Sequence, residues 1–252
     1  MIIYKLELSL MEKVFFASRE ISNFFITEPV IGNYALVYAF GFMNAPYHID
    51  SIKNETPNYL WDLRSINEMG IYITPATPID GVELELERFN GLSDSYWYMM
   101  SNNIVAASLE YKLTKKTARP ANFPQQGRLR LLLRGNKFTC FIISNQEIHI
   151  PSYIRLGKFN SKTKVDIKKV YTDPIAIKKD EASVDIYLNP LDLPPESNLK
   201  LYDLFNIPPV PLISNALIEG NFYYLDGIFL PSGLRFGIPR VQEKTSRKKN
   251  EH

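Results

Sequence analysis

Residues 152–165, SYIRLGKFNSKTKV, carry four cations on a short extended run that one glycine interrupts. Aromatic and aliphatic side chains alternate with these cations, a pattern that neither a core strand nor an ordinary solvated loop requires. Ammonium and guanidinium groups bind phosphate and aromatic rings support bases, so the run is suited to a single-stranded nucleic acid. The cations are Arg155, Lys158, Lys162 and Lys164, and the glycine is Gly157.

Each part of this run has an expected role. We expect the four cations to contact phosphates and Gly157 to let the backbone come close to the RNA. Tyr153 and Phe159 either pack against a sheet or support a base, and packing is the favoured role. The run therefore predicts a basic surface strand that binds nucleic acid, with a solvated strand as the alternative.

Charge is divided unevenly along the chain, although the formal net charge is only +2. Residues 1–110 contain 6 basic and 14 acidic side chains, whereas residues 111–252 contain 23 basic and 13 acidic ones. Residues 112–146 hold no acidic side chain and eight cations: Lys112, Lys115, Lys116, Arg119, Arg128, Arg130, Arg134 and Lys137. Such clustering is typical of a surface that binds a polyanion, with an unliganded basic surface as the alternative. We include Arg128, Arg130 and Arg134 among the candidate RNA contacts.

A glycine-rich segment near the C-terminus has a similar composition. Residues 227–240, GIFLPSGLRFGIPR, interleave glycines with aromatic and basic side chains. Glycines shape ordinary turns as well as close approaches to a ligand, so this segment alone decides little. Beside the two basic stretches, it adds Gly233, Arg235 and Gly237 to the candidate RNA contacts.

The N-terminal part of the chain offers one more candidate, Arg19. This arginine follows two phenylalanines in the loop after the first predicted strand. It is either an RNA contact or the ion-pair partner of a neighbouring carboxylate, Glu20 or Glu28. Both interpretations stay open at the level of the sequence.

Residues for catalysis or metal binding do not converge in this sequence. The three histidines are too few and too far apart to predict a metal site. The sequence contains no phosphate-binding loop, nucleophile elbow or zinc-protease motif. Glu83, Glu85 and Glu87 share one face of a predicted strand, which fits a solvated or partner-facing acidic strip better than a catalytic pair. We therefore expect a protein without a catalytic site, metal or cofactor.

The elements that must position the candidate residues are mostly strands. Alternating polarity predicts strands at 2–10, 70–76, 81–89, 103–113, 128–135, 137–144, 163–170, 182–188 and 221–230. Gly135 and Asn136 separate two of these runs and favour a tight hairpin. Helices are predicted at Ile31–Phe42, Tyr59–Met69 and Pro195–Phe205. This order predicts an α+β fold with a mostly antiparallel sheet.

Length and composition fit one domain. The chain has 252 residues, of which 45% are hydrophobic, and we assign 1–240 to a single domain. Residues 113–127 are expected to form an exposed basic excursion, and 241–252 a disordered basic tail. No apolar run approaches the ~20 residues of a membrane helix, and the N-terminus does not resemble a signal peptide. The single cysteine, Cys140, excludes a disulfide framework and fits a small core residue. We expect a cytoplasmic protein with no membrane partner.

Three segments resemble signature sequences of a known family. They are FFASREI (15–21), TEPVIGNYALVYAFG (27–41) and YIRLGKFNSK (153–162). Together they are similar to the Cas-five family subunit of type I-D CRISPR effector complexes (Csc-one), a member of the RAMP superfamily. The resemblance implies a ferredoxin-like, RRM-like core with an inserted thumb and a C-terminal glycine-rich loop. It also implies that the chain caps the 5′ handle of the CRISPR RNA and helps to position the large subunit for antiviral DNA targeting.

The resemblance also implies partners. These are the CRISPR RNA, the backbone subunit and the Cas-ten-like large subunit, with target DNA near the protospacer-adjacent motif as a further candidate. Two alternatives to a non-catalytic RNA-binding subunit stay open. One is a metal-independent endoribonuclease that processes precursor CRISPR RNA, because tyrosine and lysine are abundant and can act as acid or base. The other is an adaptor whose basic surface contacts only an acidic protein.

Overall fold

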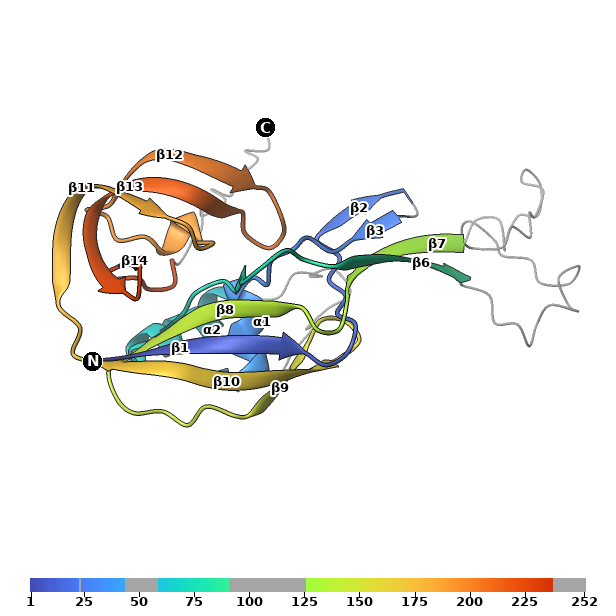
Figure 1. Cartoon of the computed structure of the whole chain (residues 1–252), viewed down its shortest axis with the longest axis horizontal. Helices are drawn as coiled ribbons and strands as arrows, with labels where there is room; N and C mark the ends of the chain where they lie inside the picture. The colour runs from blue at the N-terminus through green and yellow to red at the C-terminus, as the bar shows by residue number, and fades with distance from the viewer. Residues whose placement is uncertain (23, 44–58, 91–125, 238–252) are drawn as a thin grey trace, which may run out of the picture.

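The computed structural model describes residues 1–22, 24–43, 59–90 and 126–237. Most of the core lies on a main sheet with the strand order β4-β8-β1-β10-β9, in which β5 also pairs with β8 (Figure 1). Its strands are β1 (Ile2–Leu10), β4 (Ile71–Ile73), β5 (Thr77–Pro78), β8 (Lys137–Ser144), β9 (Tyr153–Leu156) and β10 (Ser161–Thr172). All of its pairings are antiparallel.

The main sheet forms because its strands alternate in polarity. In β1, Leu6 and Leu8 are completely buried, and they lie opposite Cys140 and Phe138 of β8, which are equally buried. Successive strand residues point to opposite faces, so the intervening polar residues of β1 lie on the more open face. Burial raises the pKa of the Cys140 thiol, and Cys140 is the small core residue that the sequence predicts.

A second sheet has the order β11-β13-β12, with β14 also paired to β13. Its strands are β11 (Ala176–Val184), β12 (Asn198–Phe205), β13 (Leu212–Leu225) and β14 (Ile228–Pro231). Its inward residues belong to the same hydrophobic cluster as those of the main sheet. In this cluster the Phe236 ring, which follows β14, lies 4.9 Å from the ring of Tyr72 in β4. The two sheets therefore share one core.

A third sheet, which we call the arm sheet, projects from this core (Figure 1). Its order is β2-β3-β7-β6, and its strands are β2 (Arg19–Ile21), β3 (Phe24–Ile26), β6 (Leu84–Asn90) and β7 (Gln126–Leu132). β3 and β7 run parallel, whereas the other pairings of this sheet are antiparallel. The expectation of mostly antiparallel sheet is therefore confirmed.

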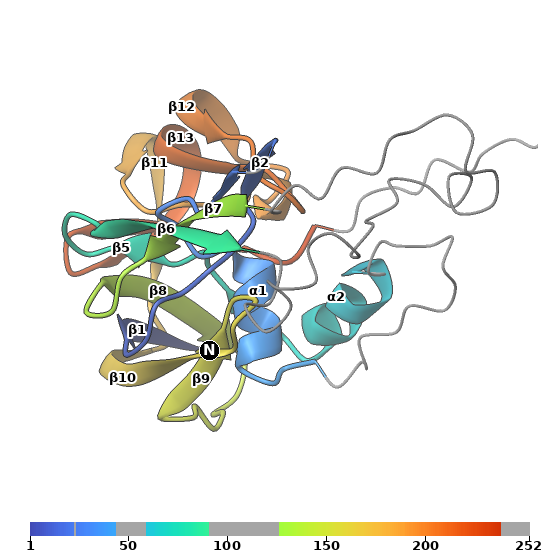
Figure 2. The same ribbon diagram turned by 90° about the vertical axis from the view of Figure 1, so that its right-hand side faces the viewer.

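Helices are few in the described part of the chain. α1 (Asn33–Ala39) packs on β9 and β4, and α2 (Tyr59–Glu68) packs on β4, so both lie beside the main sheet (Figure 2). α1 ends where Gly41 adopts a left-handed φ of 72°, as the sequence predicts. A 3₁₀ turn, η2, spans Pro190–Asp192. None of the described helices is long and apolar enough to cross a membrane.

Two local predictions are wrong. The predicted helix at Pro195–Phe205 is mainly strand β12, because residues of Asn198–Phe205 pair with β13 from one end of the strand to the other. The predicted hairpin at Gly135 and Asn136 contains a turn, but β7 and β8 on either side belong to different sheets. The Asn136 side chain accepts a hydrogen bond from the Glu83 amide and donates to its carbonyl, which ties the turn to the residue before β6.

Three other predictions fall largely outside the described residues. They are the strand at 103–113, the basic excursion at 113–127 and the tail at 241–252. The last two residues of the excursion, Gln126 and Gly127, are described and belong to β7. Arg240 of the glycine-rich segment also lies outside the described residues.

Candidate nucleic-acid interface

The basic run at 152–165 folds into a hairpin of β9 and β10 at the edge of the main sheet. Lys162 lies opposite Arg155 and Lys164 lies opposite Tyr153. Because side chains alternate between the faces of a strand, these four lie on one outer face, whereas Ile154 and its inward neighbours are buried. The two strands therefore gather three of the predicted cations, Arg155, Lys162 and Lys164, on one surface, and Lys158 lies in the turn between the strands.

Two cations of the hairpin are paired within the protein. Arg155 donates a hydrogen bond to the Asn160 carbonyl at 3.1 Å and lies 3.7 Å from a carboxylate oxygen of Glu12. Lys164 lies 2.8 Å from a carboxylate oxygen of Asp166, which raises the pKa of Lys164. These exposed ion pairs are weak and can exchange for a phosphate.

The other two cations are more open to a ligand. Lys162 lies over the ring of Tyr153, with its ammonium nitrogen 4.2 Å from the ring centroid. Lys158 is exposed and makes no ion pair with the residues that the structure describes. Tyr153 and Phe159 are themselves 49% and 55% exposed, and Phe159 packs on Phe15 at 5.3 Å between ring centroids. Both rings therefore combine packing with exposure.

Gly157 sets the position of the hairpin turn. It has a φ of +69°, and a Cβ atom there would lie 2.5 Å from the carbonyl oxygen of Phe15. The amide of Lys158 donates a 2.8 Å hydrogen bond to the same oxygen. The close approach that requires glycine is thus to the protein's own backbone, and an approach to RNA at Gly157 stays a prediction.

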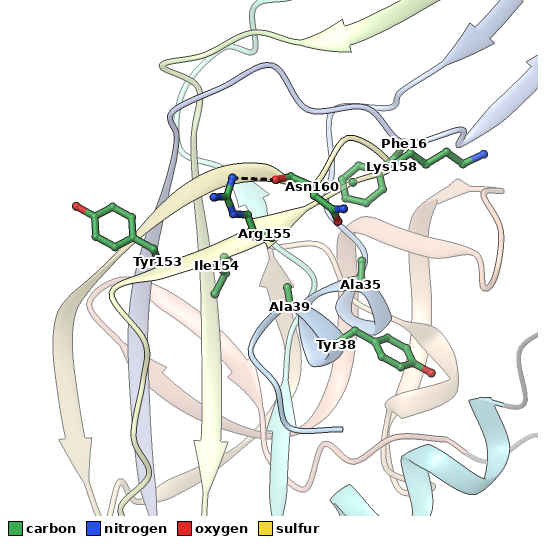
Figure 3. Close-up of a pocket in the computed structure, with 10 residues that line it drawn as sticks. Phe16, Ala35, Tyr38, Ala39, Tyr153, Ile154, Arg155, Lys158 and Asn160 are labelled. Atoms are coloured by element: carbon green, nitrogen blue, oxygen red, sulfur yellow. Dashed lines mark hydrogen bonds between the residues drawn. The ribbon is translucent and has the colours of Figure 1, made fainter. Parts of the chain in front are cut away.

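A groove runs beside the hairpin. One cavity of about 610 Å³ lies between β9 and α1, and Tyr153, Arg155 and Asn160 are among its lining residues (Figure 3). A second cavity of about 640 Å³ extends along α1 to the loop that contains Pro208 and Pro209. The two cavities share four lining residues, namely Phe16, Ala35, Tyr38 and Lys158. We treat them as one groove.

The lining of the groove fits a single-stranded nucleic acid. Among the residues that the structure describes, none that lines either cavity is acidic, and Lys158 reaches both cavities. Phe16 and Tyr38 supply aromatic rings, which can stack on bases, while Lys158 and Arg155 can hold phosphates. Sequence reasoning missed Tyr38 and Phe16 as site residues. Tyr38 lies on a helix face of alanine and tyrosine, which resembles ordinary packing, and Phe16 entered only as a neighbour of Arg19. The signal for Tyr38 was its position three residues after Ala35, on the same face of the helix.

The glycine-rich segment lies on different elements. Gly233 has a φ of +77°, and a Cβ atom at Gly237 would overlap the carbonyl oxygen of Leu191 in η2. The amide and carbonyl of Phe236 both bond to the side chain of Asn67 in α2, at 3.0 and 2.8 Å. Gly237 therefore packs closely against η2, Gly233 supplies a left-handed turn at the surface, and Arg235 between them is exposed. RNA contacts at these three residues stay a prediction.

A buried carboxylate fastens this segment to α1. Asp192 is completely buried and accepts hydrogen bonds from the side chains of Asn33 (2.7 Å) and Tyr72 (2.9 Å) and from the amide of Gly237 (2.8 Å). Burial raises the pKa of Asp192 to about 7, and these donors act in the opposite direction. Since Asn33 begins α1, the network holds one wall of the groove in place.

The remaining candidates lie on or beside the arm sheet. Arg19 of β2 and Arg130 of β7 both pair with Glu28, at 2.9 and 3.1 Å. Arg128 lies over the ring of Phe24, and Arg134 is exposed in the turn after β7. The Arg19–Glu28 pair is the ion pair that the sequence offered as an alternative to RNA contact. The described residues contain no group of three or more histidine, cysteine, aspartate or glutamate side chains suited to a metal ion.

The predicted site residues thus form three separate sets. The hairpin brings together Arg155, Gly157, Lys158, Lys162 and Lys164. The arm sheet and the turn after β7 hold Arg19, Arg128, Arg130 and Arg134, and the C-terminal segment holds Gly233, Arg235 and Gly237. Of these sets, the hairpin adjoins the groove.

The chain matches one family of known proteins. Residues 1–239 match the family described as type I-D CRISPR-associated protein Cas5/Csc1. A chain of the type III-B Cmr-beta complex bound to cognate target RNA and AMPPnP aligns with a TM-score of 0.44 and 11% identity, over 85% of this chain and 86% of that chain. A CRISPR protein from Archaeoglobus fulgidus aligns with a TM-score of 0.35 and 14% identity, over 91% and 98%. No curated protein matches the chain.

Proposed function

Because the chain belongs to the type I-D CRISPR-associated Cas5/Csc1 family, we propose that it is the RNA-binding subunit of a type I-D effector complex and caps the 5′ handle of the CRISPR RNA. The observation that carries the RNA-binding part is the groove between β9 and α1. It combines open cations, aromatic rings and an edge strand, and the described residues of its lining include no acidic side chain. These are the features that hold a single strand by its phosphates and bases.

In this proposal the cations of the hairpin contact phosphates, and the aromatic side chains of the groove contact bases. Lys158 and Lys162 contact phosphates, because within the described part of the chain the ammonium group of neither lysine pairs with a carboxylate. Arg155 joins them by exchanging Glu12 for phosphate. Phe16 and Tyr38 support bases along the groove. Gly157 keeps the turn close to Phe15, so that Lys158 faces the groove.

The strand order supports the ferredoxin-like core that belongs to this proposal. The order β4-β8-β1-β10, with helices between β1 and β4, is that of a βαββαβ sheet. A βαββαβ fold has its second helix between the third and fourth strands, but here the described chain between β8 and β10 forms the edge strand β9 instead. Because a strand replaces the helix, the edge of the sheet beside α1 faces the groove.

We further propose that the protein acts in the cytoplasm as one domain over residues 1–240 and binds the handle without cutting it. It would lie beside the backbone subunit and the Cas-ten-like large subunit, near the target DNA. An RNA-binding role requires phosphate and base contacts but no acid–base pair, and the groove supplies such contacts.

Replacing Lys158 and Lys162 by alanine should weaken binding of an RNA with the repeat-derived handle sequence. Each lost phosphate contact lowers the salt slope of single-strand binding by about 0.7, so two contacts should lower it by about 1.4. The measurement is RNA affinity across a salt titration, with a denaturing gel to show that the RNA stays intact.

The matched control replaces Lys178 and Lys179, two exposed lysines of β11, by alanine. It removes the same charge away from the groove and should leave the slope unchanged. An unchanged slope in the Lys158 and Lys162 variant would mean that these lysines do not touch phosphate. Specific cleavage of the RNA by wild-type protein would instead favour the endoribonuclease.

A further inference from the structure

Strand β12 carries an exposed apolar patch at the outer edge of the second sheet. It pairs with β13 on one side, and in the described part of the chain no strand pairs with its other side (Figure 1). Three large apolar side chains within four residues of this strand are well exposed, namely Leu201 (68%), Tyr202 (45%) and Leu204 (59%). We call these three residues the β12 patch. Single exposed apolar side chains are ordinary, but a contiguous group at an edge marks a contact with another molecule.

The irregular pairing of β12 turns the patch away from the core. Leu201 lies opposite Leu217 of β13, and the register shifts on both sides of Leu201. A regular strand directs consecutive side chains to opposite faces, whereas here the neighbours Leu201 and Tyr202 are both exposed. The core of this sheet is supplied by β13, whose Ala216 and Ile218 are completely buried. The patch therefore contributes little to folding.

The charged side chains of β12 do not shield the patch. Edge strands commonly carry charges, lysine above all, that discourage contact with other chains. The ammonium group of Lys200 donates to the Asp180 carbonyl at 3.0 Å and lies 3.2 Å from a carboxylate oxygen of Glu181. The Asp203 carboxylate accepts a 2.7 Å hydrogen bond from the Asn215 side chain. Both charges are thus held along the sheet and leave the apolar side chains uncovered.

The surroundings of the patch are acidic, although the C-terminal half of the chain is basic. Residues 176–219 contain seven acidic and three basic side chains. One of the seven, Asp192, is buried, so the others give a net charge of −3, six acidic against three basic. Lys200 is the single cation of β12 itself. Four carboxylates on β12 and the neighbouring strands form the rim of the patch: Asp180, Glu181, Asp203 and Glu219.

This charge decides which kind of molecule can cover the patch. A nucleic acid would bring its phosphates against the carboxylates of the rim, which repel them. A second copy of the chain, related by a two-fold axis, would bring the same acidic rim against itself. A different protein, with apolar side chains at the centre of its contact surface and lysine or arginine at the margin, is subject to neither repulsion.

We propose that the β12 patch is a protein-docking surface, whose partner is a different protein with an apolar contact centre surrounded by basic side chains. Tyr202 is suited to anchor this contact, because tyrosine combines apolar area with a hydroxyl group. Leu201 and Leu204 supply apolar area beside it, and the carboxylates of the rim orient the partner. The inference rests on the proposed place of the chain in an effector complex, where other subunits are the partners, but not on handle binding by the groove.

The test is a competition between the wild-type chain and a variant during assembly of the effector complex. The two chains carry distinguishable tags and are co-expressed in equal amounts with the remaining subunits and the CRISPR RNA. Their ratio in the purified complex is measured by mass spectrometry. Leu201→Ser should be incorporated at least about tenfold less than wild type. The matched control, Ile175→Ser, makes a similar change at a side chain that is 84% exposed outside the patch, and should be incorporated as well as wild type.

A charge variant tests the basic margin of the partner. Glu181, whose side chain is 59% exposed, belongs to the rim. Glu181→Lys should lower incorporation at least about threefold in the same competition, because it places a cation beside the cations of the partner. Melting curves confirm that each variant folds. The handle-RNA affinity of each isolated variant should equal that of wild type, since the patch lies outside the groove.

Four results would overturn the proposal. Equal incorporation of Leu201→Ser and wild type would show that the patch does not contact the partner. An equal loss for Ile175→Ser would show that the loss is not specific to the patch. Unchanged or higher incorporation of Glu181→Lys would contradict a basic margin. A dimer of the isolated wild-type chain that Leu201→Ser abolishes would show that a second copy covers the patch. Failure of the groove is detected separately, because handle affinity is measured on the isolated chain.

Discussion

Replacing Asp192 by alanine should lower the free energy of unfolding by about 3–5 kcal/mol. The substitution strands two buried donors, the side chains of Asn33 and Tyr72, and the half-buried amide of Gly237. Each unsatisfied buried donor costs about 1–3 kcal/mol, partly offset because the buried carboxylate itself is costly. The measurement is urea unfolding, at about pH 8 so that the carboxylate is ionised in wild-type protein.

The effect should extend to RNA binding. Asn33 begins α1, whose next turns carry Ala35 and Tyr38 of the groove. Loss of the network should therefore loosen the groove wall as well as the segment around Gly237. The control is Asp180→Ala, which removes an exposed carboxylate from β11 and should change stability by less than about 0.5 kcal/mol. An Asp192 variant as stable as this control would show that the network does not hold the elements together.

Replacing Gly157 by alanine should lower the free energy of unfolding by about 2–4 kcal/mol and weaken handle binding even at low salt. A φ of +69° costs a residue with a Cβ atom about 1–2 kcal/mol, and here the Cβ would also lie 2.5 Å from the Phe15 carbonyl oxygen. Relief of that clash must move the turn away from Phe15, which displaces Lys158 from the groove.

Two glycines of the same chain separate these effects. Gly41 has a φ of +72°, and no atom lies within 4 Å of the position that a Cβ would take there, so Gly41→Ala should show the dihedral cost alone. Gly32 has a φ of −63° and equally open surroundings, so Gly32→Ala should show neither cost. Equal destabilisation by Gly157→Ala and Gly41→Ala would contradict the clash with Phe15. Thermal melting of the three variants provides the comparison of stability. RNA affinity is compared between Gly157→Ala and Gly41→Ala, because Gly32 lines the groove and Gly41 is not among its lining residues.

Much of the strand content could be predicted from the sequence, because strict alternation of apolar and polar residues fits a strand with one buried face and does not fit a helix. In β1, the buried series Leu6, Leu8 and Leu10 fixes which face is inward, and β8 begins and ends where its apolar run does. Sheet membership could not be predicted in the same way. The turn at Gly135 looks like a hairpin in sequence, but pairing depends on partners far along the chain, which place β7 and β8 in different sheets.

The part of the candidate site with an unusual local composition could be predicted from the sequence. Arg155, Lys158, Lys162 and Lys164 stand out because a core strand excludes that much charge. Asp192 does not stand out, because an aspartate between prolines resembles an ordinary loop residue until Tyr72 and Gly237 are brought to it.

Photo-crosslinking of a thiouridine-labelled handle RNA to the protein within its assembled effector complex tests whether the groove holds the CRISPR RNA. The label forms a bond only with groups in direct contact, so the adducts report which peptides line the RNA. We expect adducts in the hairpin at 152–165 and in the groove peptides around Phe16 and Tyr38. Adducts confined to the second sheet of this protein, or found only on other subunits of the complex, would contradict handle binding by this groove.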